Sequence, residues 1–163
     1  MKDLIGATLL AVMPVAAAAQ EVCAPFTVGT NDERIVETLD AEPEGPSLGD
    51  VRLGERPLVD ADGTPVGTNR WMVTVLDPDH GGEPSHLLVK NYAIFDTGVL
   101  ISEIIVTQTV DDIHATDRTI AAESDGVVLG GTGVFASAHG TVRLLRQSDG
   151  PIDLDLQFDI SCD

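Results

Sequence analysis

The segment that most constrains the fold is IDLDLQFDI, residues 152–160, in which apolar residues alternate with Asp or Gln. Successive side chains of a β-strand point to opposite faces, so this pattern predicts a strand with one buried face and one solvated face. A helix would spread the same apolar residues around its whole surface. The chain therefore has to supply further strands with which this one can pair.

Further strand-like segments, rich in Val, Ile and Thr, precede it and are separated by turn sequences such as DADGTPVG, DPDHGGEPS, DTG and ESDG. Short connections favour antiparallel hairpins. Seven or eight strands without a convincing helix predict an all-β barrel or sandwich formed by a single domain. Before residue 48 the pattern allows a helical turn around 33–39, which the prolines at 43 and 46 would end. The predicted strands are 69–76, 86–95, 99–110, 117–123, 126–130, 133–145 and 152–160.

The stretch GGTGVFASAHG, residues 130–140, is almost bare of large side chains. Glycine reaches positive φ without steric cost, so the first three glycines predict a strand end, a turn and a restart. In the strand that follows, small residues at 136, 138 and 140 share one face, which favours a sharp bend or a close backbone approach at a barrel corner. A phosphate-binding loop would need a Gly-Lys-Ser/Thr ending and a following helix, and neither is present. The residues with this structural role are Gly130, Gly131, Gly133, Phe135 and Gly140.

The N-terminus has the pattern of a secretory signal peptide. Lys2 precedes a short apolar run that ends in small residues at positions 17–19. We predict a signal peptide over residues 1–19 and a single mature domain over 20–163, periplasmic or secreted. A retained N-terminal anchor helix is the alternative. After cleavage no segment approaches the roughly 20 apolar residues that a membrane span needs.

The two cysteines, Cys23 and Cys162, each lie near one end of the mature chain. In an oxidising compartment such an isolated pair is usually a disulfide, which would fasten the first segment to the last. A metal pair or a reactive thiol is the alternative, although the sequence has neither C-x-x-C spacing nor an adjacent His.

The chain is strongly acidic, with 27 Asp and Glu against 9 Lys and Arg and a formal charge of −18. The acidic residues are spread along the sequence, as on a solvated surface. Nucleic acids attract Lys and Arg, so this composition excludes nucleic acid as a partner.

Four segments together resemble the allene oxide cyclase and dirigent protein superfamily of small β-barrels. They are LGD (48–50), VGT (66–68), LLVKNYAIFDTG (87–98) and GGTGVFASAHG (130–140). The resemblance covers residues 48–145. It implies an eight-stranded antiparallel barrel of this calycin-like type, a homodimer or homotrimer, and an apolar cavity.

The known activities of this superfamily carry over less well than its fold. Allene oxide cyclases bind an unstable fatty-acid epoxide and steer its ring closure, and their acidic strand residue corresponds to Val75 here. Dirigent proteins guide the coupling of phenoxyl radicals, and Ala136 and His139 stand where arginines are typical. Neither activity is matched residue by residue, so the resemblance implies the barrel and its cavity.

Five residues are candidates for lining a pocket: Asn91, Glu103, Tyr92, Trp71 and His139. A pocket needs a few polar groups among apolar ones to orient its ligand, and Asn91 and Glu103 each share a strand face with apolar residues. A carboxyl group in such surroundings has a raised pKa and can transfer protons near neutral pH. The structural alternatives are an amide bonded to the backbone, a solvent-facing or oligomer-contacting carboxylate, core aromatic rings, and an exposed or satisfied histidine.

We predict no metal and no cofactor. The loop segment DPDHGGEPSH, residues 77–86, contains Asp and His side chains in no recognised ligand order, and DADG at 60–63 lacks the later ligands of a calcium loop. The sequence also has no nucleophile elbow and no Cys–His pair.

The expected partner is a small lipophilic or aromatic molecule, which the barrel binds and whose cyclisation or coupling the shape of the barrel would steer. Holding reactants in a near-attack geometry contributes about 7–11 kcal/mol in the best cases, so such steering needs few catalytic groups. If the protein is an enzyme, an isomerase of the cyclase or dirigent type is expected. A non-catalytic oligomeric binding or structural module of the cell envelope is the alternative.

Overall fold

The computed structural model describes residues 23–30, 34–42, 44, 47–77, 85–108, 123–146 and 154–163. The predicted signal peptide, residues 1–19, lies outside these ranges.

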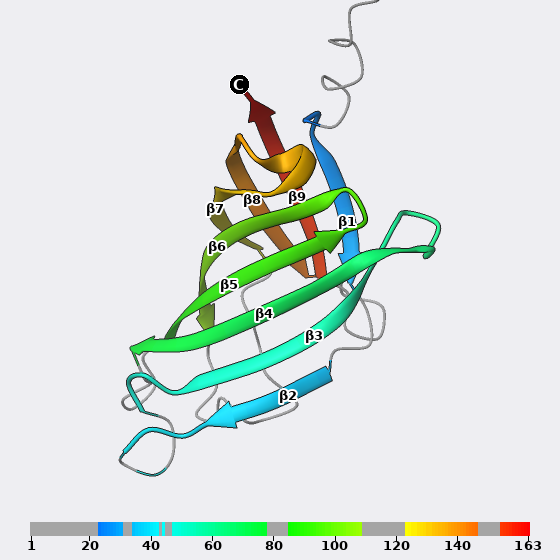
Figure 1. Cartoon of the computed structure of the whole chain (residues 1–163). Coiled ribbons are helices and arrows are strands. Elements are labelled where there is room, and N and C mark those ends of the chain that lie inside the picture. The colour runs from blue at the N-terminus through cyan, green and yellow to red at the C-terminus, as the bar shows by residue number, and fades with distance from the viewer. Residues whose placement is uncertain are drawn as a thin grey trace, which may run out of the picture.

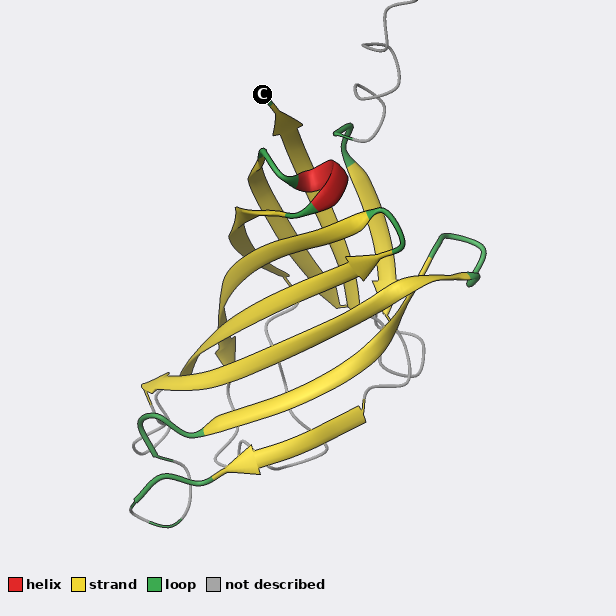
Figure 2. Cartoon of the chain, viewed as in Figure 1, coloured by secondary structure: helices red, strands yellow, loops and turns green. Residues whose placement is uncertain are grey.

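The described chain is built from β-strands, with one short 3₁₀ turn, η2 (Gly133–Phe135), between the seventh and eighth (Figure 2). Within the described ranges no helix is long and apolar enough to cross a membrane. The strands are β1 (Phe26–Thr30), β2 (Arg34–Leu39), β3 (Val51–Val59), β4 (Pro65–Asp77), β5 (Ser85–Phe95), β6 (Gly98–Gln108), β7 (Glu123–Gly131), β8 (Ala138–Arg146) and β9 (Leu154–Cys162).

Eight of these strands close into an antiparallel barrel. The sheet order is β1-β9-β8-β7-β6-β5-β4-β3-β2, and an additional pairing of β1 with β3 joins the two sides. β2 is the extra strand: it lies beyond β3 and outside the closed ring (Figure 1). The predicted eight-stranded antiparallel barrel is therefore confirmed.

The ring is closed by a short seam. β1 pairs with β9 at five described positions, from Phe26 to Thr30. It pairs with β3 at two, where Gly29 lies opposite Val59 and Thr30 opposite Leu58. The rest of that edge of β3, from Val51 to Glu55, pairs with β2. One edge of β3 is thus shared between β1 and β2.

The core lies inside the barrel and follows the alternation of its strands. In β9 the even-numbered residues from 154 to 160 are buried, while Gln157 and Asp159 are exposed. This is the arrangement that the alternating sequence predicts. The other strands contribute further buried apolar side chains to the same cluster, among them Leu58, Val75, Leu100, Ile104 and Val142.

Five local predictions differ from the structure, one of them at β1 (Phe26–Thr30), where the sequence pattern predicts no strand. The strand predicted over 117–123 lies outside the described residues except for Glu123. The helical turn expected around 33–39 is strand β2, because this segment extends the sheet along the edge of β3. β3 was not predicted, since its inward positions include two arginines and a glycine that hide the apolar alternation. The ESDG segment, expected to be a turn, is the start of β7 and pairs with β8 from Glu123 to Gly126. The strand expected from 133 begins only at Ala138, after η2.

The glycine motif supplies the close approaches between β7, η2 and the β5–β6 turn. A Cβ atom at Gly131 would collide with the carbonyl oxygen of Val99, and one at Gly133 would collide with that of Thr97. Gly133 also has a φ of 61°, in the left-handed region. The segment is bare of side chains because other backbone occupies the space.

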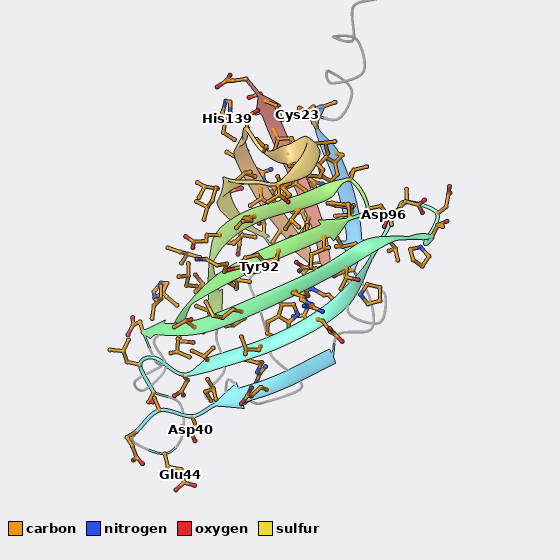
Figure 3. The ribbon with its side chains drawn as sticks, viewed as in Figure 1. Cys23, Asp40, Glu44, Tyr92, Asp96 and His139 are labelled. Carbon is orange, nitrogen blue, oxygen red and sulfur yellow. A yellow bond between two sulfur atoms is a disulfide. The ribbon has the colours of Figure 1, made fainter. Side chains whose placement is uncertain are left out.

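The predicted disulfide is present. Cys23 and Cys162 are bonded with a Cα–Cα distance of 5.8 Å and a sequence separation of 139. The bond joins the segment before β1 to the end of β9 (Figure 3). Both ends of the described chain are thereby held at the same end of the barrel.

Candidate functional site

A group of polar side chains lies inside the barrel, among the apolar residues of the core. Asn69, Trp71, Asn91 and Ser102 are each 3% exposed or less, and we call these four the inner polar cluster. They come from adjacent strands: Asn69 and Trp71 from β4, Asn91 from β5 and Ser102 from β6. Strand register brings them together, because Trp71 lies opposite Asn91 and Asn91 opposite Ser102.

The side chains of the cluster form only part of their possible hydrogen bonds with one another. Asn69 Nδ2 donates a hydrogen bond of 2.9 Å to Asn91 Oδ1. Within the described part of the chain, Asn69 Oδ1, Trp71 Nε1, Asn91 Nδ2 and Ser102 Oγ are buried and have no hydrogen-bond partner. The cluster therefore offers one acceptor oxygen, two donor nitrogen atoms and a hydroxyl that can either donate or accept.

Such groups are expensive in a folded protein. A buried donor or acceptor without a partner costs about 1–3 kcal/mol, and most native interiors contain few of them. Four on neighbouring strands of one barrel are therefore an unusual concentration. A bound molecule or ordered water that supplied the missing partners would offset this cost.

Positive charge adjoins the cluster. Arg52 and Arg56 on β3 are 1% and 4% exposed, and each has an interaction partner of its own. The Arg56 guanidinium carbon lies 5.9 Å from the centre of the Trp71 ring, within the range of a cation–π contact. Asp50, also buried, accepts hydrogen bonds from Ala41 N, Ser47 N and Ser47 Oγ at the start of β3.

Phenylalanines gather at the end of the barrel that carries the disulfide. Phe26 stacks on Phe158 with ring centres 5.0 Å apart, and Phe95 packs against Phe135 at 5.6 Å. Phe26 also meets Phe95 edge to face at 6.0 Å. A hollow of about 380 Å³ opens here, and we call it the phenylalanine mouth. It is lined by Ala24, Pro25, Phe26, Val66, Phe95, Asp96, Thr97 and Phe135.

The phenylalanine mouth and the inner polar cluster belong to the same inner face. On β5, Phe95 lines the mouth, and Ala93 and Asn91 follow at the next two inward positions. Four residues of strand span about 13 Å. Between them Ala93, fully buried, contributes only a methyl group. The backbone distance from Phe95 to Asn91 is therefore about the length of a small organic molecule.

The structure divides the five predicted pocket residues between the two faces of the barrel wall. Asn91 and Trp71 lie on the inner face, directly opposite each other in the pairing of β4 with β5. Tyr92 is 36% exposed on the outer face of β5. Glu103 also lies on the outer face, where its carboxylate forms an ion pair of 2.7 Å with Lys90. The hydrogen bond and the charge of Glu103 raise the pKa of Lys90.

His139 is exposed at the disulfide end of the barrel (Figure 3). Its Nδ1 lies 3.3 Å from the carbonyl oxygen of Ser137, and its Nε2 shares a hydrogen bond of 3.0 Å with Ser161 Oγ. Both ring nitrogens thus have protein partners on the surface.

The loop with the alternative metal ligands falls mostly outside the described residues. Of its side chains, the structure places Asp77 and His86, which form an exposed pair with Asp77 Oδ2 3.4 Å from His86 Nδ1. In the described ranges no three His, Cys, Asp or Glu side chains come together as a metal site.

Sequence reasoning did not find Asn69, Ser102, Arg52 and Arg56. Asn69 and Ser102 could have been found, because each occupies the inward phase of a strand whose other inward residues are apolar. The two arginines gave no such signal, since charged residues at alternate positions usually mark the solvated face.

No protein-family model matches the chain, and no curated protein matches its sequence. Solved structures do resemble it. A structure described as pyocyanin demethylase aligns with a TM-score of 0.58 and 17% identity, covering 85% of this chain and 100% of that one. The Diels-Alderase AbmU from Streptomyces koyangensis aligns with a TM-score of 0.52 and 15% identity, covering 90% and 82%. At this level of identity the likeness shows the fold. The chain therefore shares its barrel fold with these two proteins.

Proposed function

We propose that the mature chain, residues 20–163, is a single-domain barrel that binds a small lipophilic or aromatic molecule in its interior and steers the cyclisation or coupling of that molecule. The observation that carries this proposal is the inner polar cluster, four buried polar side chains whose remaining hydrogen-bonding atoms face the barrel interior. A few polar groups among apolar walls are what orients a ligand. We place the protein with the allene oxide cyclase and dirigent type of barrel.

The chemistry follows from what the cluster contains. Donors such as Trp71 Nε1 and Asn91 Nδ2 can bind a carbonyl oxygen and stabilise negative charge that develops on it. Cyclisation of one bound molecule converts a π bond or a strained ring bond of that molecule into a new ring bond, so it is an isomerisation without a leaving group or a redox partner. In the coupling alternative the reactants arrive as radicals already formed by an oxidant outside the barrel, and the new bond pairs their two unpaired electrons. The apolar wall would hold a reactive conformation, which contributes about 7–11 kcal/mol in the best cases. The barrel proteins named above as a Diels-Alderase and a demethylase support this kind of substrate.

The disulfide supports an extracytoplasmic location. Disulfides persist in the periplasm or outside the cell and are rare in the cytosol. With the signal-peptide pattern over 1–19, this supports a periplasmic or secreted protein.

The first test is native mass spectrometry of the mature protein purified from its own host, under conditions that keep small molecules bound. A co-purifying lipophilic or phenolic compound is the expected result. The Asn91→Ala variant should lose that compound, and Glu103→Ala, altered on the outer face, should retain it. Retention by both variants would place the compound elsewhere and would contradict the proposal.

An assembly role is the second candidate, and a feature of the outer wall favours it. Ile105, Val127 and Leu129 are 56%, 49% and 53% exposed on neighbouring strands β6 and β7. Such apolar side chains commonly mark a contact surface. We propose a homodimer or homotrimer formed through this surface, tested by analytical ultracentrifugation of the wild type and of Val127→Lys. A wild-type monomer would rule it out.

A further inference from the structure

The phenylalanine mouth offers aromatic side chains, and the inner polar cluster offers hydrogen-bonding atoms without partners among the described residues. A hydrocarbon would leave the hydrogen-bonding atoms of the cluster unpaired, and a small polar solute would leave the aromatic side chains of the mouth without a contact. We propose that the mouth and the cluster are two halves of one site, which takes a planar aromatic molecule with an oxygen-bearing end, ring at the mouth and oxygen at the cluster. This inference rests on the proposed function and specifies the class of ligand and its orientation.

The donors at the cluster define the oxygen-bearing end. Trp71 Nε1 and Asn91 Nδ2 lack hydrogen-bond partners among the described residues, and the side chains that carry them face each other across adjacent strands. A single carbonyl, phenolate or carboxylate oxygen has two lone-pair directions and can accept from both. Ser102, opposite Asn91, adds a hydroxyl at the same level.

Charge favours an anionic or strongly polarised oxygen. The guanidinium of Arg56 lies over the Trp71 ring, and Arg52 is buried four residues earlier on β3. Asp50, also buried, accepts hydrogen bonds from backbone and hydroxyl donors, and each of the two arginines has an interaction partner of its own. In a low-dielectric interior a charged group acts on its neighbours more strongly than in water. Two buried arginines are notable in a chain whose net charge is −18.

The mouth defines the aromatic end. Phe26, Phe95 and Phe135 already contact one another with ring centres 5.6–6.4 Å apart, in edge-to-face and tilted arrangements. A further ring can join such a group by offset stacking or edge contact. Along β5 about 13 Å of strand separates the backbone positions of Phe95 and Asn91, and this distance is the upper limit on the length that such a molecule needs, because both side chains extend into the interior.

Three probes of nearly equal shape test the inference by calorimetry: naphthalene, naphthol and naphthoate. We expect naphthoate to bind most tightly and naphthalene least. Trp71→Phe, which keeps a ring but removes the N–H donor, should reduce the preference for naphthoate over naphthalene by about tenfold. Phe95→Leu should weaken all three probes by a similar factor, because it changes only the apolar end. Tyr92→Leu, on the outer face beside Asn91, should leave all three affinities unchanged.

The outcomes separate this inference from the proposed function. Equal binding of the three probes, or an unchanged preference in Trp71→Phe, overturns the inference, and a co-purifying ligand in native mass spectrometry would leave the proposed function standing. If no probe binds, the aromatic end is wrong. If in addition no molecule co-purifies, the proposed function fails with it. Far-ultraviolet circular dichroism of each variant identifies any that does not fold, and Val66→Ala at the rim of the mouth then replaces Phe95→Leu.

Discussion

At the scale of single residues, the unpaired polar atoms of the inner polar cluster should lower the stability of the ligand-free protein. Ser102 Oγ is buried without a hydrogen-bond partner in the described structure, so removing it should relieve a desolvation cost. We expect Ser102→Ala to raise the free energy of unfolding by about 1 kcal/mol, or the melting temperature by about 2–4 °C. Thermal unfolding of the ligand-free protein measures this.

The exposed Ser137 is the matched control, because its hydroxyl donates to the carbonyl oxygen of Asp163 at the surface. Ser137→Ala should change stability by less than about 0.5 kcal/mol. A Ser102→Ala protein that is less stable than the wild type would mean that the hydroxyl is satisfied, and that the cluster has fewer groups to offer a ligand.

Gly131 is the second residue whose replacement is informative. An added Cβ would meet the carbonyl oxygen of Val99 and the Cβ of Phe135, neither of which can move without shifting backbone. We expect Gly131→Ala to cost about 1–3 kcal/mol in chemical denaturation. Gly29→Ala is the comparison, since the new methyl would meet mainly the flexible side chain of Val59, at 3.2 Å. Equal costs at the two positions would contradict this account of the glycine motif.

At the scale of elements, the disulfide fixes the rim of the phenylalanine mouth. Ala24, Pro25 and Phe26 follow Cys23 directly and line that hollow. Replacing both cysteines by serine should lower the free energy of unfolding by about 2–5 kcal/mol, because the bond closes a long loop. Denaturation of the variant, and of the wild type under reducing conditions, should give the same loss. A stable variant with unchanged unfolding would show that β1 needs no covalent anchor.

Strands could be predicted from the sequence wherever inward residues are apolar, as in β4, β5, β6 and β9. β3 could not, because Arg52, Gly54 and Arg56 occupy its inward positions and read as a solvated pattern. The sequence pattern also could not show which side of a strand faces the interior, and this limited the prediction of the site residues. Asn91 and Trp71 could be placed on a strand face from alternation alone. Which of the two faces is the interior depends on barrel closure, and closure puts Glu103 and Tyr92 outside.

At the scale of the whole molecule, charge opposes compaction. A net charge of −18 on a folded chain of 163 residues repels itself, and salt screens that repulsion. Between about 10 mM and 150 mM ionic strength the Debye length falls from about 30 Å to about 8 Å. We expect the melting temperature to rise over this range, by the same amount in sodium chloride and potassium chloride. A melting temperature independent of salt would show that the acidic residues lie too far apart to interact.

The short pairing of β1 with β3 that closes the ring determines where the barrel opens in a local fluctuation. β1 is held to β3 at two described positions but to β9 at five, and the disulfide adds a covalent tie on the β9 side. A local fluctuation that opens the ring breaks the fewest strand pairings if it separates β1 from β3. β1 then stays attached to β9, so the barrel becomes a curved sheet whose free edges remain neighbours. Reclosure needs no search for a partner, and each opening briefly uncovers the inward face of Leu58 and Thr30 without unfolding the rest.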